Sequence, residues 1–264
     1  MKLNLLRFAA GLLVFAATTC LAQPSPTNNP TLFLIGDSTV KNGTKGQVGW
    51  GTPIAKWFDA SKASVQNRAL GGRSSRTFLT EGLWDKVLAD IKPGDVVLMQ
   101  FGHNDGGGLK DPKGRASIKG TGDETAEASD AKTGQPVTVH SYGWYLRRYI
   151  ADATSKGAVP VVLSPIPRNI WKDDKVARAV NDYGKWAAES AKSSGVPFID
   201  LNELVARRYE ELGEAKVKTE FFGATDHTHT TPAGAELNAE IVAKAVAELK
   251  QLPLAAHVLK EPAK

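Results

Sequence analysis

The chain contains 264 residues with 33 Lys or Arg, 28 Asp or Glu and a formal net charge of +5. This length is sufficient for one domain with a sizeable hydrophobic core. The charge is small and the basic residues are dispersed, without interleaved aromatic residues, so no nucleic-acid partner is expected.

The first 22 residues have the pattern of a secretory signal peptide. Lys2 and Arg7 give a basic start, residues 8–17 are apolar, and small residues precede a cleavage point after Ala22. The apolar run is too short to span a bilayer comfortably, and no later segment is apolar enough, so no membrane span is expected after cleavage. A lipoprotein signal ending at Cys20 is the alternative. The residues before it are Ala17-Thr18-Thr19, whereas such signals usually carry Leu three places upstream and Gly or Ala directly before the cysteine.

Cleavage after Ala22 predicts a secreted or periplasmic protein. Because Cys20 is the only cysteine, the mature chain would contain none, which excludes a disulfide, a zinc–thiolate site and a cysteine nucleophile. Residues 23–30 are rich in Pro, Asn and Ser and are interpreted as a linker. Residues 31–264 show no internal repeat and no shift in composition, so they are predicted to form a single domain.

Strand-like apolar runs alternate with helical patterns along this domain. The predicted strands lie at 32–36, 63–67, 96–101, 159–163 and 196–201. The main predicted helices lie at 53–60, 83–91, 142–156, 176–194, 204–212 and 232–249. This alternation predicts an α/β fold, in which a parallel sheet is covered by helices on both faces. The polar, Gly-rich stretch 106–138 leaves a strand end and is predicted to be a long loop at the edge of a cleft.

Polar side chains follow the predicted strands, where the ends of parallel strands meet at one edge of a sheet. Ser38 follows the first strand, Gly72 lies in a glycine turn after the second, and Asn104 follows the third. Asp226 and His229 lie in the loop before the last helix. We therefore expect these separate segments to converge on one site.

Each residue of this set matches a role in nucleophilic catalysis. Ser38 is a weak nucleophile that needs a base, and His229 is a suitable one. Asp226 lies three residues earlier and could hold the imidazole. The N–H groups of Ser38 and Gly72 and the side-chain amide of Asn104 could stabilise an oxyanion.

Other interpretations of these residues are open at this point. Ser38 could lie in an ordinary turn or cap a helix, and Asp226 could merely cap a turn. The His227-x-His229 spacing is also found in metal sites, but no convincing third ligand accompanies it, so no metal is predicted.

Four blocks in this order resemble those of the SGNH (GDSL-like) hydrolases. They are Gly36-Asp37-Ser38, Asn67 with Gly72, Gly102-His103-Asn104-Asp105 and Asp226-x-x-His229. The longer forms, such as Gly-Gly-Arg-Ser-Ser-Arg at 71–76 and Asp-His-Thr-His-Thr-Thr-Pro-Ala-Gly-Ala at 226–235, resemble rhamnogalacturonan acetylesterases. The resemblance covers residues 32–249.

The resemblance implies a flavodoxin-like, three-layer α/β/α sandwich with a five-stranded parallel sheet. It implies a catalytic triad of Ser38, Asp226 and His229, an oxyanion hole of Ser38, Gly72 and Asn104, and no metal or organic cofactor. The expected partner is an acetylated plant polysaccharide or oligosaccharide, and the expected activity is removal of acetyl groups from the pectin rhamnogalacturonan. A broader acetylesterase acting on xylan or small acetylated sugars, and an inactive carbohydrate-binding protein, are the alternatives.

Several side chains are candidates for binding such a substrate. Arg73, Arg76, Arg115 and Arg168 lie in or near strand-end loops, and a guanidinium binds a galacturonate carboxylate well. Arg73 and Arg76 could equally well anchor their loop through carbonyl groups. His140 begins a segment, 140–147, that resembles bacterial members of the family, and it is a candidate for either a substrate contact or a structural role.

Overall fold

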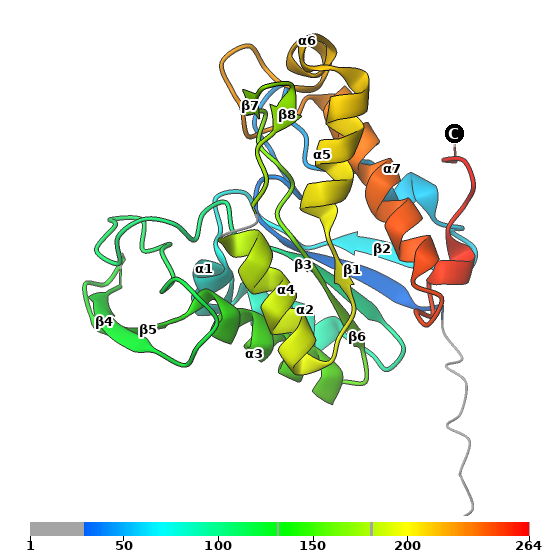
Figure 1. Ribbon diagram of the computed structural model, residues 1–264. Coiled ribbons are helices and arrows are strands. Elements are labelled where there is room, and N and C mark those ends of the chain that lie inside the picture. The colour runs from blue at the N-terminus through cyan, green and yellow to red at the C-terminus, as the bar shows by residue number, and fades with distance from the viewer. Residues whose placement is uncertain (1–28, 131, 180–181, 264) are drawn as a thin grey trace, which may run out of the picture.

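The strand order of the central sheet determines where the predicted site residues lie. The structure, a computed structural model, describes residues 29–130, 132–179 and 182–263 (Figure 1). Five parallel strands pair in the order β2-β1-β3-β6-β9. They are β1 (Thr31–Gly36), β2 (Ser64–Asn67), β3 (Val96–Gln100), β6 (Val159–Leu163) and β9 (Phe198–Ile199). This arrangement confirms the predicted parallel sheet.

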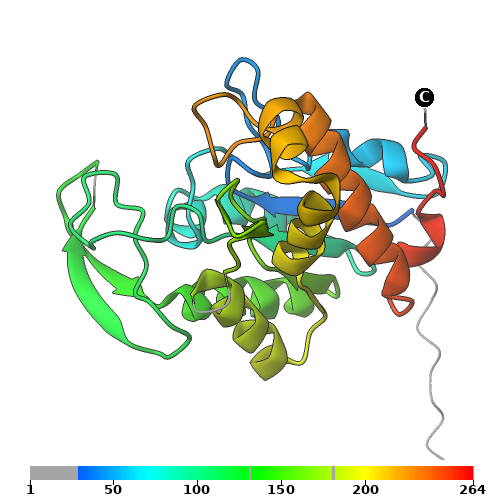
Figure 2. The same cartoon turned by 45° about the horizontal axis from the view of Figure 1, so that its top comes forward.

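Helices cover both faces of the sheet, because alternate residues of each strand point to opposite sides. In β1, Leu32 and Leu34 belong to one buried cluster, whereas Phe33 and Ile35 belong to the other. The first cluster is completed by η1 (Pro53–Trp57), α5 (Leu201–Leu212) and α7 (Pro232–Glu248). The second is completed by α1 (Ser75–Thr80), α2 (Leu83–Asp90), α3 (Tyr142–Ser155) and α4 (Tyr183–Ser194). The three layers, visible in Figure 2, confirm the predicted fold class.

The chain reverses its direction of travel across the sheet between β1 and β3. From β1 it passes outward to the edge strand β2, and it then crosses back to β3 on the other side of β1. In open α/β sheets, ligands bind in the crevice beyond the strand ends at such a switch point. Ser38 follows β1 and Asn104 follows β3, so both lie at this point.

A buried chain of hydrogen bonds links the turn after β1 to the end of β3. Trp50 Nε1 donates to Gln100 Oε1 at 2.9 Å, and Gln100 Nε2 donates to Thr39 Oγ1 at 2.5 Å. Thr39 in turn donates to Asp37 Oδ1 from its hydroxyl at 2.7 Å and from its backbone N–H at 2.8 Å. All four side chains are buried, so hydrogen bonds in the protein interior hold the turn that carries Ser38.

The stretch 106–138 was predicted to be a long loop, but it contains part of a β-hairpin. Strands β4 (Thr125–Ser129) and β5 (Pro136–His140) pair antiparallel and extend away from the sheet (Figure 1). Most of their residues are exposed or half-buried, because little packs against either face. A strand such as Thr-Ala-Glu-Ala-Ser lacks the large apolar residues by which a strand is recognised in a sequence.

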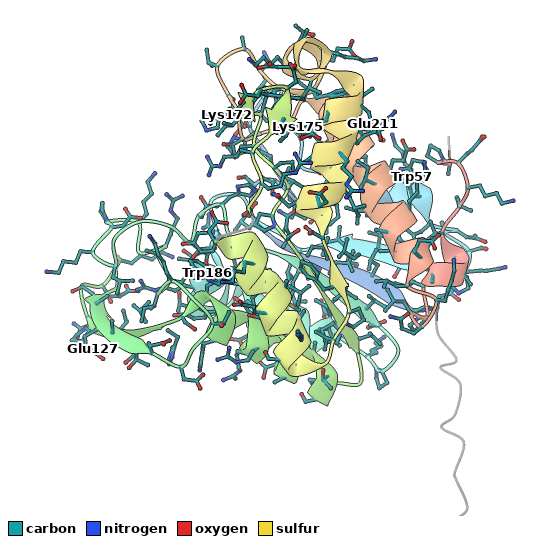
Figure 3. The ribbon with its side chains drawn as sticks, in the orientation of Figure 1. Trp57, Glu127, Lys172, Lys175, Trp186 and Glu211 are labelled. Atoms are coloured by element: carbon teal, nitrogen blue, oxygen red, sulfur yellow. The ribbon has the colours of Figure 1, made fainter. Side chains whose placement is uncertain are left out.

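The predicted helix 176–194 was placed too far toward the N-terminus. Helix α4 begins at Tyr183, and β7 (Trp171–Lys172) and β8 (Lys175–Val176) form a short hairpin before it. Asp173 and Asp174 have φ values of 50° and 58°, as a two-residue primed turn requires. Figure 3 shows Lys172 and Lys175 on this hairpin, beside α5.

Other boundaries differ by smaller amounts. The predicted helix 53–60 is the short 3₁₀ helix η1, and α5 begins at Leu201, where Asp200 Oδ1 accepts a hydrogen bond from the Glu203 N–H. The segments α6 (Glu214–Lys216), η2 (Val217–Phe221) and η3 (Ala255–His257) were not predicted. The predicted signal peptide, residues 1–22, and most of the linker lie outside the described residues.

Replacing Gln100 with methionine tests the buried hydrogen-bond chain. Gln100→Met preserves the approximate size of the side chain but leaves the Trp50 N–H without an acceptor and removes a donor to Thr39. We expect the free energy of unfolding to fall by about 2–4 kcal/mol, because each unpaired buried group costs about 1–3 kcal/mol. Chemical denaturation measures this loss.

Gln135→Met is the matched control, since Gln135 is exposed and its side chain forms no hydrogen bond among the described residues. We expect it to change stability by less than about 0.5 kcal/mol. Equal losses of unfolding free energy in the two variants would contradict a stabilising role for the buried hydrogen bonds.

Candidate active site

Three of the predicted site residues form a continuous hydrogen-bonded array. Ser38 Oγ lies 2.8 Å from His229 Nε2, and His229 Nδ1 lies 2.7 Å from Asp226 Oδ2. Ser38 comes from the turn after β1, whereas the other two come from the loop before α7. The structure therefore brings together residues separated by almost 200 positions in the sequence.

The Asp226 carboxylate is held by donors from two segments. Its Oδ1 accepts the backbone N–H groups of Thr228 at 2.7 Å and His229 at 2.9 Å. Its Oδ2 accepts from Gln47 Nε2 at 2.8 Å in addition to His229. Partial burial by itself raises the pKa of Asp226, but the hydrogen bonds from His229 and Thr228 and the charge of the imidazole outweigh it and lower the pKa to about 2. The carboxylate is consequently ionised at any neutral or mildly acidic pH.

Gln47 is a site residue that the sequence interpretation did not single out. It reaches Asp226 because Val48 pairs with Thr230 through two hydrogen bonds, of 2.9 Å between backbone groups and 2.8 Å from the Thr230 hydroxyl. These hydrogen bonds hold the loop after β1 beside the loop before α7. No local pattern around Gln47 signals this long-range contact.

The backbone donors predicted for an oxyanion are free of protein acceptors. Among the described residues, neither the Ser38 N–H nor the Gly72 N–H donates to another protein group. A Cβ built on Gly71 would lie 3.5 Å from Ser38 Cβ, so the glycine turn packs directly beside the serine. Gly72 has a φ of +78°, a backbone conformation that favours glycine.

Asn104 is held in place from both ends of its amide. Its Nδ2 donates to the Arg73 carbonyl at 3.1 Å, and its Oδ1 accepts from an Arg115 guanidinium nitrogen at 2.8 Å. Because Nδ2 carries two hydrogens, one remains available to a ligand. Arg115 therefore orients Asn104.

Asp105, the next residue, anchors this segment in the protein interior. Its carboxyl group is fully buried and accepts hydrogen bonds from the Ser75 N–H at 3.1 Å, the Ser75 hydroxyl and the Ser117 hydroxyl at 3.2 Å. Burial nevertheless raises the pKa of Asp105 to about 7. The loop after β3 is thus tied to the N-terminus of α1.

Apart from Arg115, which contacts Asn104, the four predicted substrate-binding residues lie in different surroundings. Arg73 donates to Glu81 at 3.0 Å and to the Gly71 carbonyl at 3.1 Å. Arg76 is only 4% exposed and donates to the Ala116 carbonyl at 3.1 Å. These contacts match the loop-anchoring role and leave Arg76 too buried to reach a substrate.

Arg168 and His140 complete that set. Arg168 Nη1 donates to Thr228 Oγ1 at 3.0 Å, beside the Asp226–His229 segment. His140 lies at the end of β5 and stacks on Trp144, with ring centroids 3.7 Å apart and planes inclined by 9°. Its contacts join it to the hairpin and α3, and none of them reaches Ser38, Asp226 or His229 among the described residues.

Within the segments that the structure describes, no three His, Cys, Asp or Glu side chains are grouped as metal ligands. In the same segments, no helix combines the length and apolar character needed to cross a membrane.

These features define an α/β protein with a Ser–His–Asp array at the switch point of its sheet. Residues 34–237 match the model of the GDSL-like lipase/acylhydrolase family, and the chain belongs to this family. It is accordingly a serine-type ester hydrolase.

Two curated relatives are similar over most of their length. The chain is 34% identical over 216 residues to a rhamnogalacturonan acetylesterase of Emericella nidulans, covering 82% of this chain and 84% of that one. It is 34% identical over 235 residues to a probable rhamnogalacturonan acetylesterase of Bacillus subtilis, covering 87% of this chain and 98% of that one.

Solved structures share the fold at lower identity. A Bacillus subtilis protein has a TM-score of 0.68 at 24% identity, covering 86% of this chain, and the chain spans only 58% of that protein. An acetylxylan esterase from Geobacillus stearothermophilus has a TM-score of 0.54 at 17% identity, covering 88% of this chain and 97% of that one.

The raised pKa of Asp105 predicts a pH-dependent stability. An unfolded aspartate titrates near pH 4, so between about pH 4 and pH 7 the folded protein keeps a proton that the unfolded chain has released. The contribution of Asp105 is therefore greatest below pH 4 and is lost as the pH rises through about 7.

Comparison with Asp105→Asn isolates this contribution, because asparagine does not titrate. From pH 4 to pH 7, we expect the unfolding free energy of the wild type, relative to the variant, to fall by up to about 1.4 kcal/mol per pH unit. Urea unfolding at several pH values measures it. Parallel pH profiles for the two proteins would contradict the raised pKa.

Proposed function

We propose that this protein is a carbohydrate O-acetylesterase that removes acetyl groups from rhamnogalacturonan. The observation that carries the proposal is the Ser38–His229–Asp226 array, in which 2.8 Å and 2.7 Å contacts join nucleophile, base and carboxylate. The names of the two relatives at 34% identity support the acetyl and rhamnogalacturonan assignments.

In the first half of the proposed reaction, Ser38 Oγ attacks the acetyl carbonyl carbon. His229 Nε2 accepts the hydroxyl proton as the bond forms, and the ionised Asp226 stabilises the resulting imidazolium. The negative charge moves to the carbonyl oxygen, where the N–H groups of Ser38 and Gly72 and the Asn104 amide can donate to it. The imidazolium then protonates the sugar oxygen, the C–O bond breaks, and acetyl-Ser38 remains.

Water completes the cycle in the second half of the proposed reaction. His229 accepts a proton from water as its oxygen attacks the acetyl carbonyl, which regenerates the same oxyanion geometry. Collapse breaks the bond to Ser38 Oγ, acetate leaves, and His229 returns the proton to the serine. Every proton transfer is made by one imidazole, whose tautomer Asp226 fixes through Nδ1.

Export is part of the same proposal and rests on the sequence alone. The predicted leader that ends at Ala22 lies outside the described residues, so secretion stays a prediction.

Acetate release from acetylated rhamnogalacturonan, xylan and mannan tests the activity. We expect the highest kcat/KM on acetylated rhamnogalacturonan and no activity for Ser38→Ala. Preference for xylan would replace the assigned substrate, and acetate release by Ser38→Ala equal to that of wild type would refute the mechanism.

Two aspartates near the nucleophile are predicted to differ in importance. Asp226→Asn removes the charge that holds His229, and we expect kcat to fall by about 10³–10⁴-fold, as for other triads. Asp37→Asn retains an oxygen that can accept both Thr39 donors, so its loss of kcat should be much smaller. Steady-state kinetics on an aryl acetate measures both effects, and a larger loss at Asp37 would reverse the assignment.

A further inference from the structure

Gln47, which donates to the Asp226 carboxylate, is itself held by a second amide. Asn42 Nδ2 donates to Gln47 Oε1 at 2.9 Å, and Asn42 Oδ1 accepts the Thr44 N–H at 2.8 Å. Gln47 Nε2 then donates to Asp226 Oδ2 at 2.8 Å. Two side-chain amides in series therefore connect a backbone N–H of the loop after β1 to the carboxylate beside His229.

The direction of these hydrogen bonds is fixed independently at each end. The Thr44 N–H can only donate, so the oxygen of Asn42 faces it and the nitrogen of Asn42 faces Gln47. The Asp226 carboxylate, whose pKa is about 2, is ionised and can only accept, so the nitrogen of Gln47 faces it. Both ends require the same orientation of the two amides, and a reversed Gln47 would place its oxygen against the carboxylate.

Asp226 Oδ2 is the oxygen that Gln47 and His229 share. His229 Nδ1 lies 2.7 Å from it, whereas the backbone N–H groups of Thr228 and His229 donate to Oδ1. The donors on Oδ1 come from the loop of Asp226 itself, and Gln47 adds a contact from a second segment. This contact restrains rotation of the carboxylate and takes up part of the negative charge that faces the imidazole.

The backbone holds Gln47 in this place. Its N–H donates to the Thr44 carbonyl at 3.0 Å, and the next residue, Val48, pairs with Thr230 in the loop before α7. Gln47 and Asn42 are both half-buried, whereas residues 43–46 between them are exposed. The two amides are thus held by hydrogen bonds although the segment that joins them is exposed.

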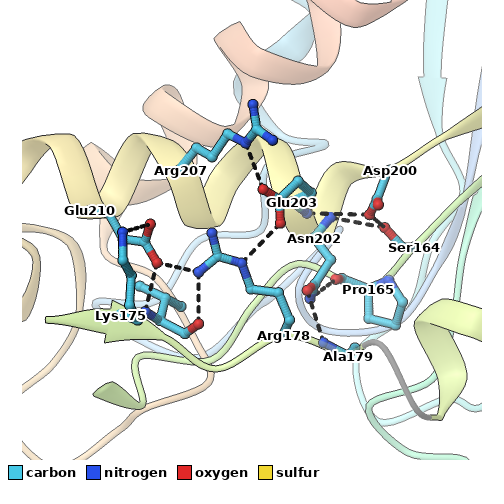
Figure 4. Close-up of polar contacts among 11 residues, drawn as sticks. Ser164, Pro165, Lys175, Arg178, Ala179, Asp200, Asn202, Glu203, Arg207 and Glu210 are labelled. Atoms are coloured by element: carbon cyan, nitrogen blue, oxygen red, sulfur yellow. Dashed lines mark hydrogen bonds and ion pairs between the residues drawn. The ribbon is translucent and has the colours of Figure 1, made fainter. Parts of the chain in front are cut away.

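Asn202 provides a comparison, since both partners of its amide belong to the backbone (Figure 4). Its Nδ2 donates to the Pro165 carbonyl at 2.8 Å, and its Oδ1 accepts the Ala179 N–H at 2.9 Å. Asn202 therefore ties the segment between β6 and α4 to α5. Gln47 differs, because one of its two partners is the carboxylate that contacts the imidazole.

We propose that Gln47 is a positioning residue for Asp226 and that Asn42 sets the orientation of Gln47. The donor direction of the two amides holds the carboxylate and sets the strength of the Asp226–His229 hydrogen bond. Neither amide contacts the reacting atoms, and both act through the carboxylate. This inference rests on the proposed function, because Asp226 acts through His229 in the proposed reaction.

Two different substitutions at Asn42 test the proposal. Asn42→Asp keeps an oxygen for the Thr44 N–H but replaces the donor to Gln47 with an acceptor, so the nitrogen of Gln47 turns away from Asp226. Asn42→Ala removes both contacts but leaves Gln47 free to donate to the carboxylate. Lys45→Met, at an exposed lysine of the same loop, is the control, because it changes the net charge by the same amount as Asn42→Asp.

The rate of 4-nitrophenyl acetate hydrolysis is the first measurement. We expect kcat to fall by about tenfold in Asn42→Asp and in Gln47→Met, with KM within about twofold, because positioning is lost and substrate contacts are not. Asn42→Ala should lose less than about threefold, and Lys45→Met should match wild type. If Asn42 only supported the loop, the order would be the opposite, since alanine removes more contacts than aspartate.

The proton between His229 and Asp226 gives the second measurement. Loss of the Gln47 donor leaves more negative charge on Asp226 Oδ2 and strengthens its hydrogen bond with His229 Nδ1. We therefore expect the low-field proton resonance of this N–H to move further downfield in Gln47→Met and Asn42→Asp and to stay in place in Lys45→Met. His229→Gln, which lacks this proton, identifies the resonance.

Two results would overturn the positioning role. One is a loss of kcat in Asn42→Ala that equals or exceeds the loss in Asn42→Asp. The other is a wild-type kcat or an unmoved resonance in Gln47→Met. Circular dichroism checks that each variant is folded. Gln47→Glu, which sets an acceptor against Asp226, replaces Asn42→Asp if that variant does not fold, and it should lose at least as much kcat as Gln47→Met.

Failure of the proposed function is distinguishable from these results. In that case Ser38→Ala would hydrolyse the aryl acetate as well as wild type does, or wild type would release no acetate from any acetylated carbohydrate, whatever the variants of Gln47 and Asn42 show.

Discussion

In the proposed mechanism, the turn after β1 has to hold Ser38 at one place while exposing its hydroxyl to a substrate. The buried hydrogen bonds from Trp50 through Gln100 and Thr39 to Asp37 meet this requirement. They join the turn to the last residue of β3, the strand that leads into the Asn104 segment. The proposed nucleophile and the proposed oxyanion donor are therefore both attached to this buried hydrogen-bonded group, and the geometry of both depends on the same few contacts.

The same constraint explains why two nearby aspartates serve different ends. Asp37 is fully buried, and its Oδ1 is occupied by the donors of Thr39. Asp226 is half-buried and faces His229, with Thr228 and Gln47 completing its shell. Both residues are carboxylates in turns, yet only Asp226 contacts the imidazole. The different proposed roles of Asp37, which stabilises the turn, and Asp226, which holds the imidazole, therefore follow from their surroundings and not from their residue type.

Sequence patterns predicted the parts of this molecule that depend on local signals. Apolar runs such as 96–101 identified the strands, and alternation of strands with helices implied a parallel sheet whose ends meet at one edge. The four motif blocks, through their resemblance to a family, placed Ser38 with His229. The structure brings that pair to 2.8 Å.

What the patterns missed depends on contacts that are distant in sequence. Gln47 reaches Asp226 only because the loops around Val48 and Thr230 pair. The β4–β5 hairpin is held by backbone hydrogen bonds between its own two strands and contains few large apolar side chains. A search for hydrophobic periodicity therefore does not detect it. The arginines show the same limit most clearly. Arg76 and Arg168 were both candidates because they lie in strand-end loops, but burial and partners separate them. Arg76 is buried and donates to the Ala116 carbonyl, whereas Arg168 is half-buried and donates to Thr228. Which of the candidate arginines stays accessible at the strand ends is thus decided by tertiary contacts, and the sequence does not reveal these contacts.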